Sequence, residues 1–218
     1  MVRTGIWTAW RNYMLDPGKL NEEAMRSLDA FLLIARSYDI PVIFTFFAFL
    51  PELWNGENAY LDPRSIQAQK EFVSLIVQRY SMMNDVMWDL INEPSFCSPQ
   101  YLWSCRPNYD QYEHAAWKAW LSKKYPVQPN ETERDRDFTL RQQYRLTTND
   151  ALNLPSLDDF TSANILYNKR PLKTVDYKFF AQAMFAQWSK ELTETIRTNG
   201  NPKQLITVGQ DEAGTGAC

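Results

Sequence analysis

The chain alternates continuous apolar runs with stretches in which apolar residues recur every three or four positions. The run IPVIFTFF (40–47) is rich in β-branched and aromatic residues and is typical of a strand buried on both faces, as in a parallel sheet. Recurrence at helical spacing predicts helices with one apolar face. The expected strands lie at 2–7, 40–47, 85–91 and 204–212. The expected helices lie at 21–38, 63–80, 109–124 and 174–199.

Residues at the ends of these stretches support the predicted helices. Asp62 and Pro63 supply an N-cap and a first-turn proline for the helix 63–80. A glycine and a proline in NGNP (199–202) end the last helix. The segment LDPGKLNEEAM (15–25) is expected to form a turn that leads into the first helix, whose apolar face we expect to include Phe31.

Strands that alternate with helices predict parallel βαβ units, and therefore an α/β fold in one domain over 1–218. Residues 97–173 break this rhythm, since they are polar and punctuated by proline, and we expect them to form an insertion of loops and helices. Four strands cannot close an eight-stranded barrel, and an open parallel sheet leaves both edges bare. We therefore expect the natural protein to continue past Cys218.

Composition narrows the classes of function. The net charge is −3 and no basic stripe is present, which argues against a nucleic-acid partner. No apolar run reaches the ~18 residues that a membrane-spanning helix needs. Three cysteines without a C-x-x-C pair and a single histidine argue against a zinc site. Cys97 and Cys105 either bridge one loop or are both thiols.

The most specific chemical signal is Glu93, which follows a predicted buried strand directly. In parallel α/β sheets, functional groups cluster just past the C-terminal ends of the strands. A carboxyl group in a partly desolvated cleft there has a raised pKa and can donate a proton near neutral pH. Asn92 is placed to bond a substrate hydroxyl, and Pro94 stiffens the turn.

The segment WDLINEPS (88–95) resembles the end of the fourth strand in clan A glycoside hydrolases, which are (β/α)8 TIM barrels. VRTGIW (2–7) looks like the second strand, where family 5 members carry Val-Arg at the same place, IPVIFTFF (40–47) looks like the third, and NPKQLITVGQ (201–210) looks like the fifth. Between strands four and five, AWKAWLSKKY (116–125) followed by LPSLDDF (154–160) and DYKFFAQAMFAQW (176–188) is similar in layout to the family 42 β-galactosidases. The resemblance implies a partial barrel of strands two to five with a helical insertion after the fourth family strand.

The resemblance also implies an activity, the hydrolysis of β-linked O-glycosides in an oligo- or polysaccharide by a retaining mechanism with two carboxylates. Glu93 would be the acid/base catalyst, Asn92 would contact the sugar 2-hydroxyl, and Arg3 would lie beneath the nucleophile and hold it ionised. No metal or organic cofactor is implied.

Two departures from the family pattern concern the rest of the site. Phe46 and Phe47 stand where family 5 carries a histidine at the end of strand three. The family nucleophile, a glutamate on strand seven, has no matching position. Glu212 follows a strand and is either the nucleophile, a substrate-binding residue or a solvated carboxylate.

Further candidates lie at the ends of other strands. Trp7, Trp10 and Trp54 are expected either to stack on sugar rings or to pack under loops. Gln210 and Asp211 are candidates for bonding sugar hydroxyls, and Asp211 is also a candidate helix cap. The alternative function is that of a non-catalytic carbohydrate-binding protein or an inactive barrel fragment.

Overall fold

The computed structural model describes residues 1–5, 13–102, 104–146, 151–167 and 171–209 of the chain. Its main sheet has four parallel strands in the order β1-β4-β5-β6. The strands are β1 (Val2–Gly5), β4 (Val42–Ala48), β5 (Val86–Asn92) and β6 (Ile206–Thr207). The α/β class and the parallel sheet predicted from the sequence are therefore confirmed.

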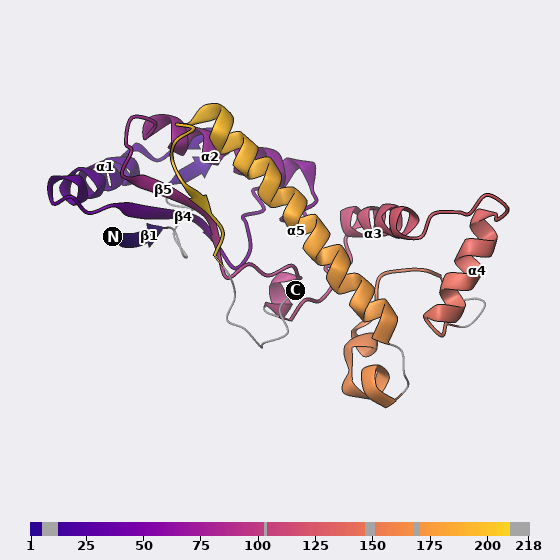
Figure 1. The fold of residues 1–218 in the computed structure, drawn as a ribbon. Helices are drawn as coiled ribbons and strands as arrows, with labels where there is room; N and C mark the ends of the chain where they lie inside the picture. The colour runs from indigo at the N-terminus through magenta and orange to yellow at the C-terminus, as the bar shows by residue number, and fades with distance from the viewer. Residues whose placement is uncertain (6–12, 103, 147–150, 168–170, 210–218) are drawn as a thin grey trace.

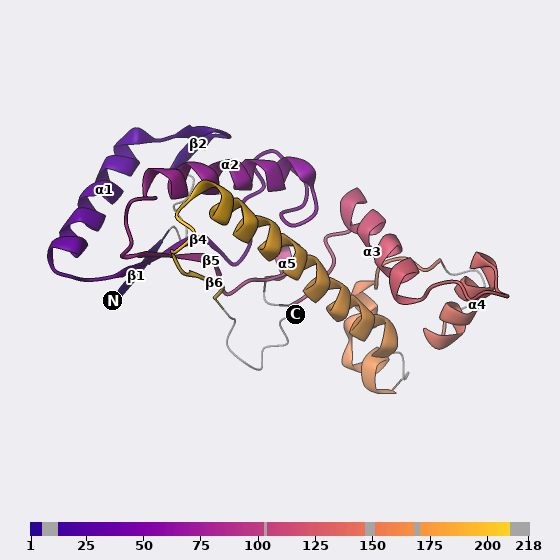
Figure 2. The ribbon, with the colours of Figure 1, turned by 45° about the horizontal axis from the view of Figure 1, so that its top comes forward.

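Three long helices pack with this sheet and define one hydrophobic layer. They are α1 (Glu22–Ser37), α2 (Pro63–Arg79) and α5 (Pro171–Asn199). Helices α2 and α5 lie side by side over the same face of the sheet (Figures 1 and 2). Asp62 caps α2 as predicted, because its Oδ1 accepts a hydrogen bond from the Arg64 backbone N–H at 2.9 Å.

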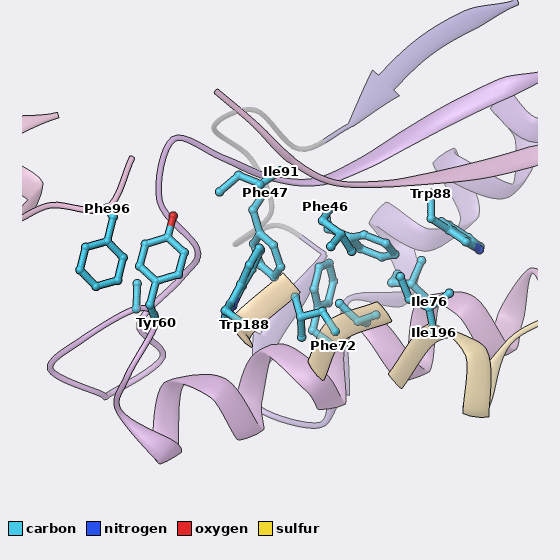
Figure 3. Close-up of a cluster of buried hydrophobic side chains, with 14 of the residues drawn as sticks. Phe46, Phe47, Tyr60, Phe72, Ile76, Trp88, Ile91, Phe96, Trp188 and Ile196 are labelled. Carbon is cyan, nitrogen blue, oxygen red and sulfur yellow. The ribbon is translucent and has the colours of Figure 1, made fainter. Parts of the chain in front are cut away.

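The core fills the space between the sheet and these two helices with aromatic rings (Figure 3). Phe46 on β4 stacks on Trp88 on β5 with ring centroids 5.3 Å apart. Phe72 on α2 meets Phe46 edge-on at 6.2 Å, and both side chains are fully buried. Each large ring buries much apolar area, so these aromatic side chains stabilise the packing of the sheet against α2 and α5.

The insertion forms a helical lobe beside the sheet (Figure 1, right). It contains η2 (Pro99–Tyr101), α3 (Gln111–Lys124), α4 (Glu133–Gln143), η3 (Leu157–Phe160) and η4 (Ala163–Tyr167). A buried carboxylate joins this lobe to α5. Asp176 accepts hydrogen bonds from Lys124 Nζ at 2.5 Å, Tyr125 OH at 2.7 Å and Tyr144 OH at 2.6 Å.

Several boundaries and contacts differ from the predictions. A short hairpin of β2 (Met14–Asp16) and β3 (Lys19–Leu20) occupies the segment expected to be only a turn. Helix α5 begins at Pro171, three residues before the expected start. Phe31 is 38% exposed, so the apolar face of α1 is narrower than the periodicity suggested.

Two other expectations concern cysteines and membranes. Cys97 is not in a disulfide whereas Cys105 is, so neither the bridge between Cys97 and Cys105 nor the pair of thiols is present. Within the described ranges, we find no helix with the length and apolar character to span a bilayer.

Candidate active site

The exits of β4 and β5 lie side by side, and backbone hydrogen bonds join them. Ala48 and Asn92 are partners in the parallel register and end their strands together. Beyond this pair, Phe49 N–H donates to the Asn92 carbonyl at 2.8 Å, and Ser95 N–H donates to the Phe49 carbonyl at 2.7 Å. The turn that carries Glu93 is thus held against the end of the neighbouring strand.

Glu93 lies directly after the last residue of β5 and is partly exposed. Its φ is 47°, in the left-handed region that few non-glycine residues adopt. Such conformations persist where the surrounding structure enforces them, and they cluster at functional sites. The predicted location of Glu93 at the C-terminal end of a buried parallel strand is confirmed, while its catalytic role stays a prediction.

Asn92 is 4% exposed, and its side-chain amide nitrogen has no hydrogen-bond partner among the residues that the structure describes. Buried polar groups are nearly always hydrogen-bonded, because an unmade bond leaves the desolvation penalty uncompensated. An unsatisfied amide beside Glu93 is therefore an unusual feature of this strand exit.

Arg3 takes part in a partly buried polar cluster across three strands. The Asp89 carboxylate accepts hydrogen bonds from Arg3 Nε at 3.2 Å, from Arg3 Nη2, and from Thr45 Oγ1 at 2.9 Å. Gly209 N–H donates to the other carboxylate oxygen at 3.0 Å. Asp89 is 1% exposed, so Arg3 supplies the charge that a buried carboxylate needs.

This cluster gives Arg3 a partner that the sequence reading did not name. The predicted role of Arg3 beneath a nucleophile is not tested, but its guanidinium is held by Asp89 and directed along the sheet toward Gly209. Asp89 was missed because a single polar residue inside WDLIN does not break an apolar pattern. The sequence did contain one indication of this cluster: Thr45 is the one polar residue in IPVIFTFF, and it pairs with Asp89 in the parallel register.

A cavity of about 250 Å³ opens beyond the same strand ends. Its wall is built from the segment after β4, the segment after β5 and the start of α3. The lining residues are Leu50, Pro51, Glu52, Leu53, Glu57, Asn58, Ala59, Tyr60, Phe96, Cys97, Pro99, Asn108 and Glu113. Glu93 is not among them, so the cavity adjoins the turn of Glu93 without including its side chain.

Glu113 is a buried carboxyl group in the wall of this cavity. It is 1% exposed, and its oxygens accept hydrogen bonds from Tyr177 OH at 2.6 Å, Asn108 N–H at 2.6 Å and Tyr109 N–H at 2.9 Å. Desolvation by burial raises the pKa of Glu113 to about 7, although these three hydrogen bonds act in the opposite direction. Sequence reasoning missed this residue, because an acidic residue in the first turn of a helix is ordinary.

Gln69 fixes the far wall of the cavity to the core. This fully buried residue of α2 donates from Nε2 to the carbonyls of Glu52 and Ala59, both at 2.8 Å. Its Oε1 accepts from Trp188 Nε1 on α5 at 2.8 Å. One side chain thereby anchors both ends of the loop 52–59 to the two central helices.

The remaining predicted site residues divide into packed and undescribed positions. Trp54 packs against Phe72 and Phe47, at 5.5 and 6.3 Å between ring centroids. Of the two alternatives predicted for Trp54, stacking on a sugar or packing under a loop, these contacts correspond to packing. Phe46 and Phe47 are both fully buried in the core. Trp7, Trp10, Gln210, Asp211 and Glu212 lie outside the described residues.

A scan against protein-family models finds no match, and a search of curated proteins finds no significant match. Within the part of the chain that the structure describes, no three histidine, cysteine, aspartate or glutamate side chains are grouped so that they could hold a metal ion.

Proposed function

We propose that the protein is a glycoside hydrolase that cleaves β-linked O-glycosides with retention, and that its parallel sheet is a segment of a (β/α)8 barrel. The observation that carries the proposal is the position of Glu93. It follows a buried parallel strand, in a left-handed conformation, next to the unsatisfied amide of Asn92. Strand ends of this kind are where barrel enzymes place catalytic groups.

In the proposed reaction, Glu93 protonates the glycosidic oxygen as the leaving group departs. It then removes a proton from the water that hydrolyses the glycosyl-enzyme intermediate. Asn92 donates from its side-chain amide to the hydroxyl next to the anomeric carbon. The nucleophile must be a second carboxylate about 5–5.5 Å from Glu93. It is either a carboxylate that this sequence does not contain or Glu212.

The substitution Glu93→Gln tests this proposal when two substrates are compared. One is an aryl β-glycoside with a poor leaving group, and the other is a dinitrophenyl glycoside, whose departure needs no acid. We expect a loss of about 10²–10⁴-fold in the turnover of the poor substrate, which is the usual contribution of a general acid. The loss in the first step for the activated substrate should be much smaller.

Glu133→Gln is a matched control, because Glu133 is an exposed carboxylate in the first turn of α4 in the insertion. It should leave both turnovers unchanged. Unchanged turnover of the poor substrate by Glu93→Gln would refute the assignment. Binding of oligosaccharide without hydrolysis of either glycoside would instead favour a non-catalytic carbohydrate-binding protein.

A further inference from the structure

The exit of β4 contains a rare backbone turn centred on Phe49. Leu50 N–H donates to the Ala48 carbonyl at 2.7 Å, which closes a turn of three residues. Phe49, the central residue, has a φ of 64°. A γ-turn with a positive φ at its centre is uncommon and strained, and a phenylalanine has none of the conformational freedom of glycine.

The strained residue presents both of its backbone polar groups to the exit of β5. Its N–H donates to the Asn92 carbonyl at 2.8 Å, and its carbonyl accepts from Ser95 N–H at 2.7 Å. These two bonds bracket Glu93 and Pro94, the residues that lie between their partners in the sequence. Pro94 has no N–H of its own, so it adds no backbone donor that would hold the turn in another way.

The two strand exits are strained together. Glu93 has a φ of 47°, so each of the two paired strands is followed at once by a non-glycine residue in the left-handed region. Conformations of this kind persist only where neighbouring contacts enforce them. The bonds between Phe49 and the residues on both sides of Glu93 are contacts of the required kind.

We infer that the backbone of Phe49 is a positioning element that fixes the direction in which the Glu93 side chain leaves the sheet. This inference rests on the proposed function of Glu93 as acid/base. A displacement of about 1 Å in a catalytic group is enough to lower a rate by about 10²-fold. Loss of the two bonds between Phe49 and the residues on either side of Glu93 should therefore lower the rate of proton donation by Glu93. Its effect on the stability of the fold should be smaller.

Two substitutions at Phe49 separate its backbone from its ring. Phe49→Gly keeps the N–H and the carbonyl and adopts a positive φ without strain. Phe49→Pro removes the N–H and cannot adopt a positive φ. We expect Phe49→Gly to keep the ratio of kcat/KM on the poor leaving group to kcat/KM on the activated one, because kcat/KM reports the first step, in which Glu93 acts as the acid. We expect Phe49→Pro to lower that ratio about 10²-fold.

An amide-to-ester replacement at Phe49 covers the case in which Phe49→Pro does not fold. It removes the N–H that bonds the Asn92 carbonyl and also weakens the Ala48 carbonyl as an acceptor for Leu50 N–H. A matched ester at Val42 removes an equivalent strand bond, from Val42 N–H to the Asp85 carbonyl at 2.8 Å, at the opposite end of β4. The ester at 49 should lower the leaving-group ratio, and the ester at 42 should not.

The result that overturns the inference is an unchanged ratio for the ester at 49, or equal changes for the two esters. Glu93→Gln, measured in parallel, separates this failure from that of the proposed function. If Glu93→Gln lowers the ratio and the ester at 49 does not, the acid/base assignment stands and the positioning role is wrong. If Glu93→Gln leaves the ratio unchanged, both are wrong, because no proton donor is there to be positioned.

Discussion

Glu113 makes the stability of the fold depend on pH near neutrality, and Glu113→Gln should remove that dependence. The pKa of this carboxyl rises from the ordinary 4.5 to about 7 because burial disfavours its charged form. Below pH 4.5 the group is protonated in both the folded and the unfolded chain. Between pH 4.5 and 7 the folded chain keeps a proton that the unfolded chain releases, so the free energy of unfolding falls as pH rises.

The size of the effect follows from these two values. Each pH unit between them corresponds to about 1.36 kcal/mol, so the full difference amounts to about 3 kcal/mol. A measurement from pH 5 to pH 8 covers most of this range and should record a fall of about 2.5 kcal/mol. The stabilisation is complete below the unfolded pKa and is lost once the pH exceeds the folded pKa of about 7.

The assay is urea unfolding of the wild type and Glu113→Gln at pH 5, 6, 7 and 8. Subtracting the two curves cancels the other titrating groups. Leu121→Ala is the control, because it removes a buried side chain from the same helix without changing a charge. Its cost, about 2–5 kcal/mol, should not vary with pH. A difference between wild type and Glu113→Gln that stays constant from pH 5 to 8 would refute the reasoning.

Two further predictions concern the frame around the site. Gln69→Leu should lower the free energy of unfolding by about 3 kcal/mol, because it leaves the buried Trp188 Nε1–H and the carbonyls of Glu52 and Ala59 without their hydrogen-bond partner. A loss below about 1 kcal/mol in urea unfolding would contradict this. Phe72→Ala should cost about 3–5 kcal/mol, since Phe72 is fully buried among three aromatic neighbours. An unchanged midpoint in thermal unfolding would show that these contacts do not stabilise the core.

The sequence predicted the sheet well because its central strands are buried on both faces. Such strands appear as unbroken apolar runs, and β4 and β5 begin and end within two residues of the expected limits. Helix α2 was equally well marked, because Asp62 and Pro63 fix its start through local chemistry. Where a local signal and a tertiary requirement agree, the pattern alone places the element.

The hairpin of β2 and β3 and the exposure of Phe31 show where the pattern fails. Strands of three and two residues are too short to show any periodicity. The only feature of this segment that the sequence indicated was the turn at Asp16 to Lys19. Phe31 has the spacing of a buried residue on α1. Its exposure depends on where neighbouring elements lie, and no sequence spacing records that.

The site divides in the same way. The position of Glu93 was predictable, because it depends only on where a buried strand ends. The left-handed φ of Glu93 and its two flanking hydrogen bonds to Phe49 were not predictable. Both arise from contact between two strand exits that lie more than 40 residues apart in the sequence. Glu113 was hidden for a further reason: its burial requires the insertion to fold back over those exits.

The insertion therefore contributes chemistry to the strand ends. Helix α3 brings the buried carboxyl of Glu113 into a cavity whose wall also holds Glu52 and Glu57. Among the described residues, that wall contains no lysine or arginine, so no cationic side chain lines it to bind an anion. A ligand rich in hydroxyl donors suits such a wall better than an anion does. The same wall changes charge as Glu113 titrates, so the affinity of a neutral ligand should respond less to pH than the affinity of a charged one.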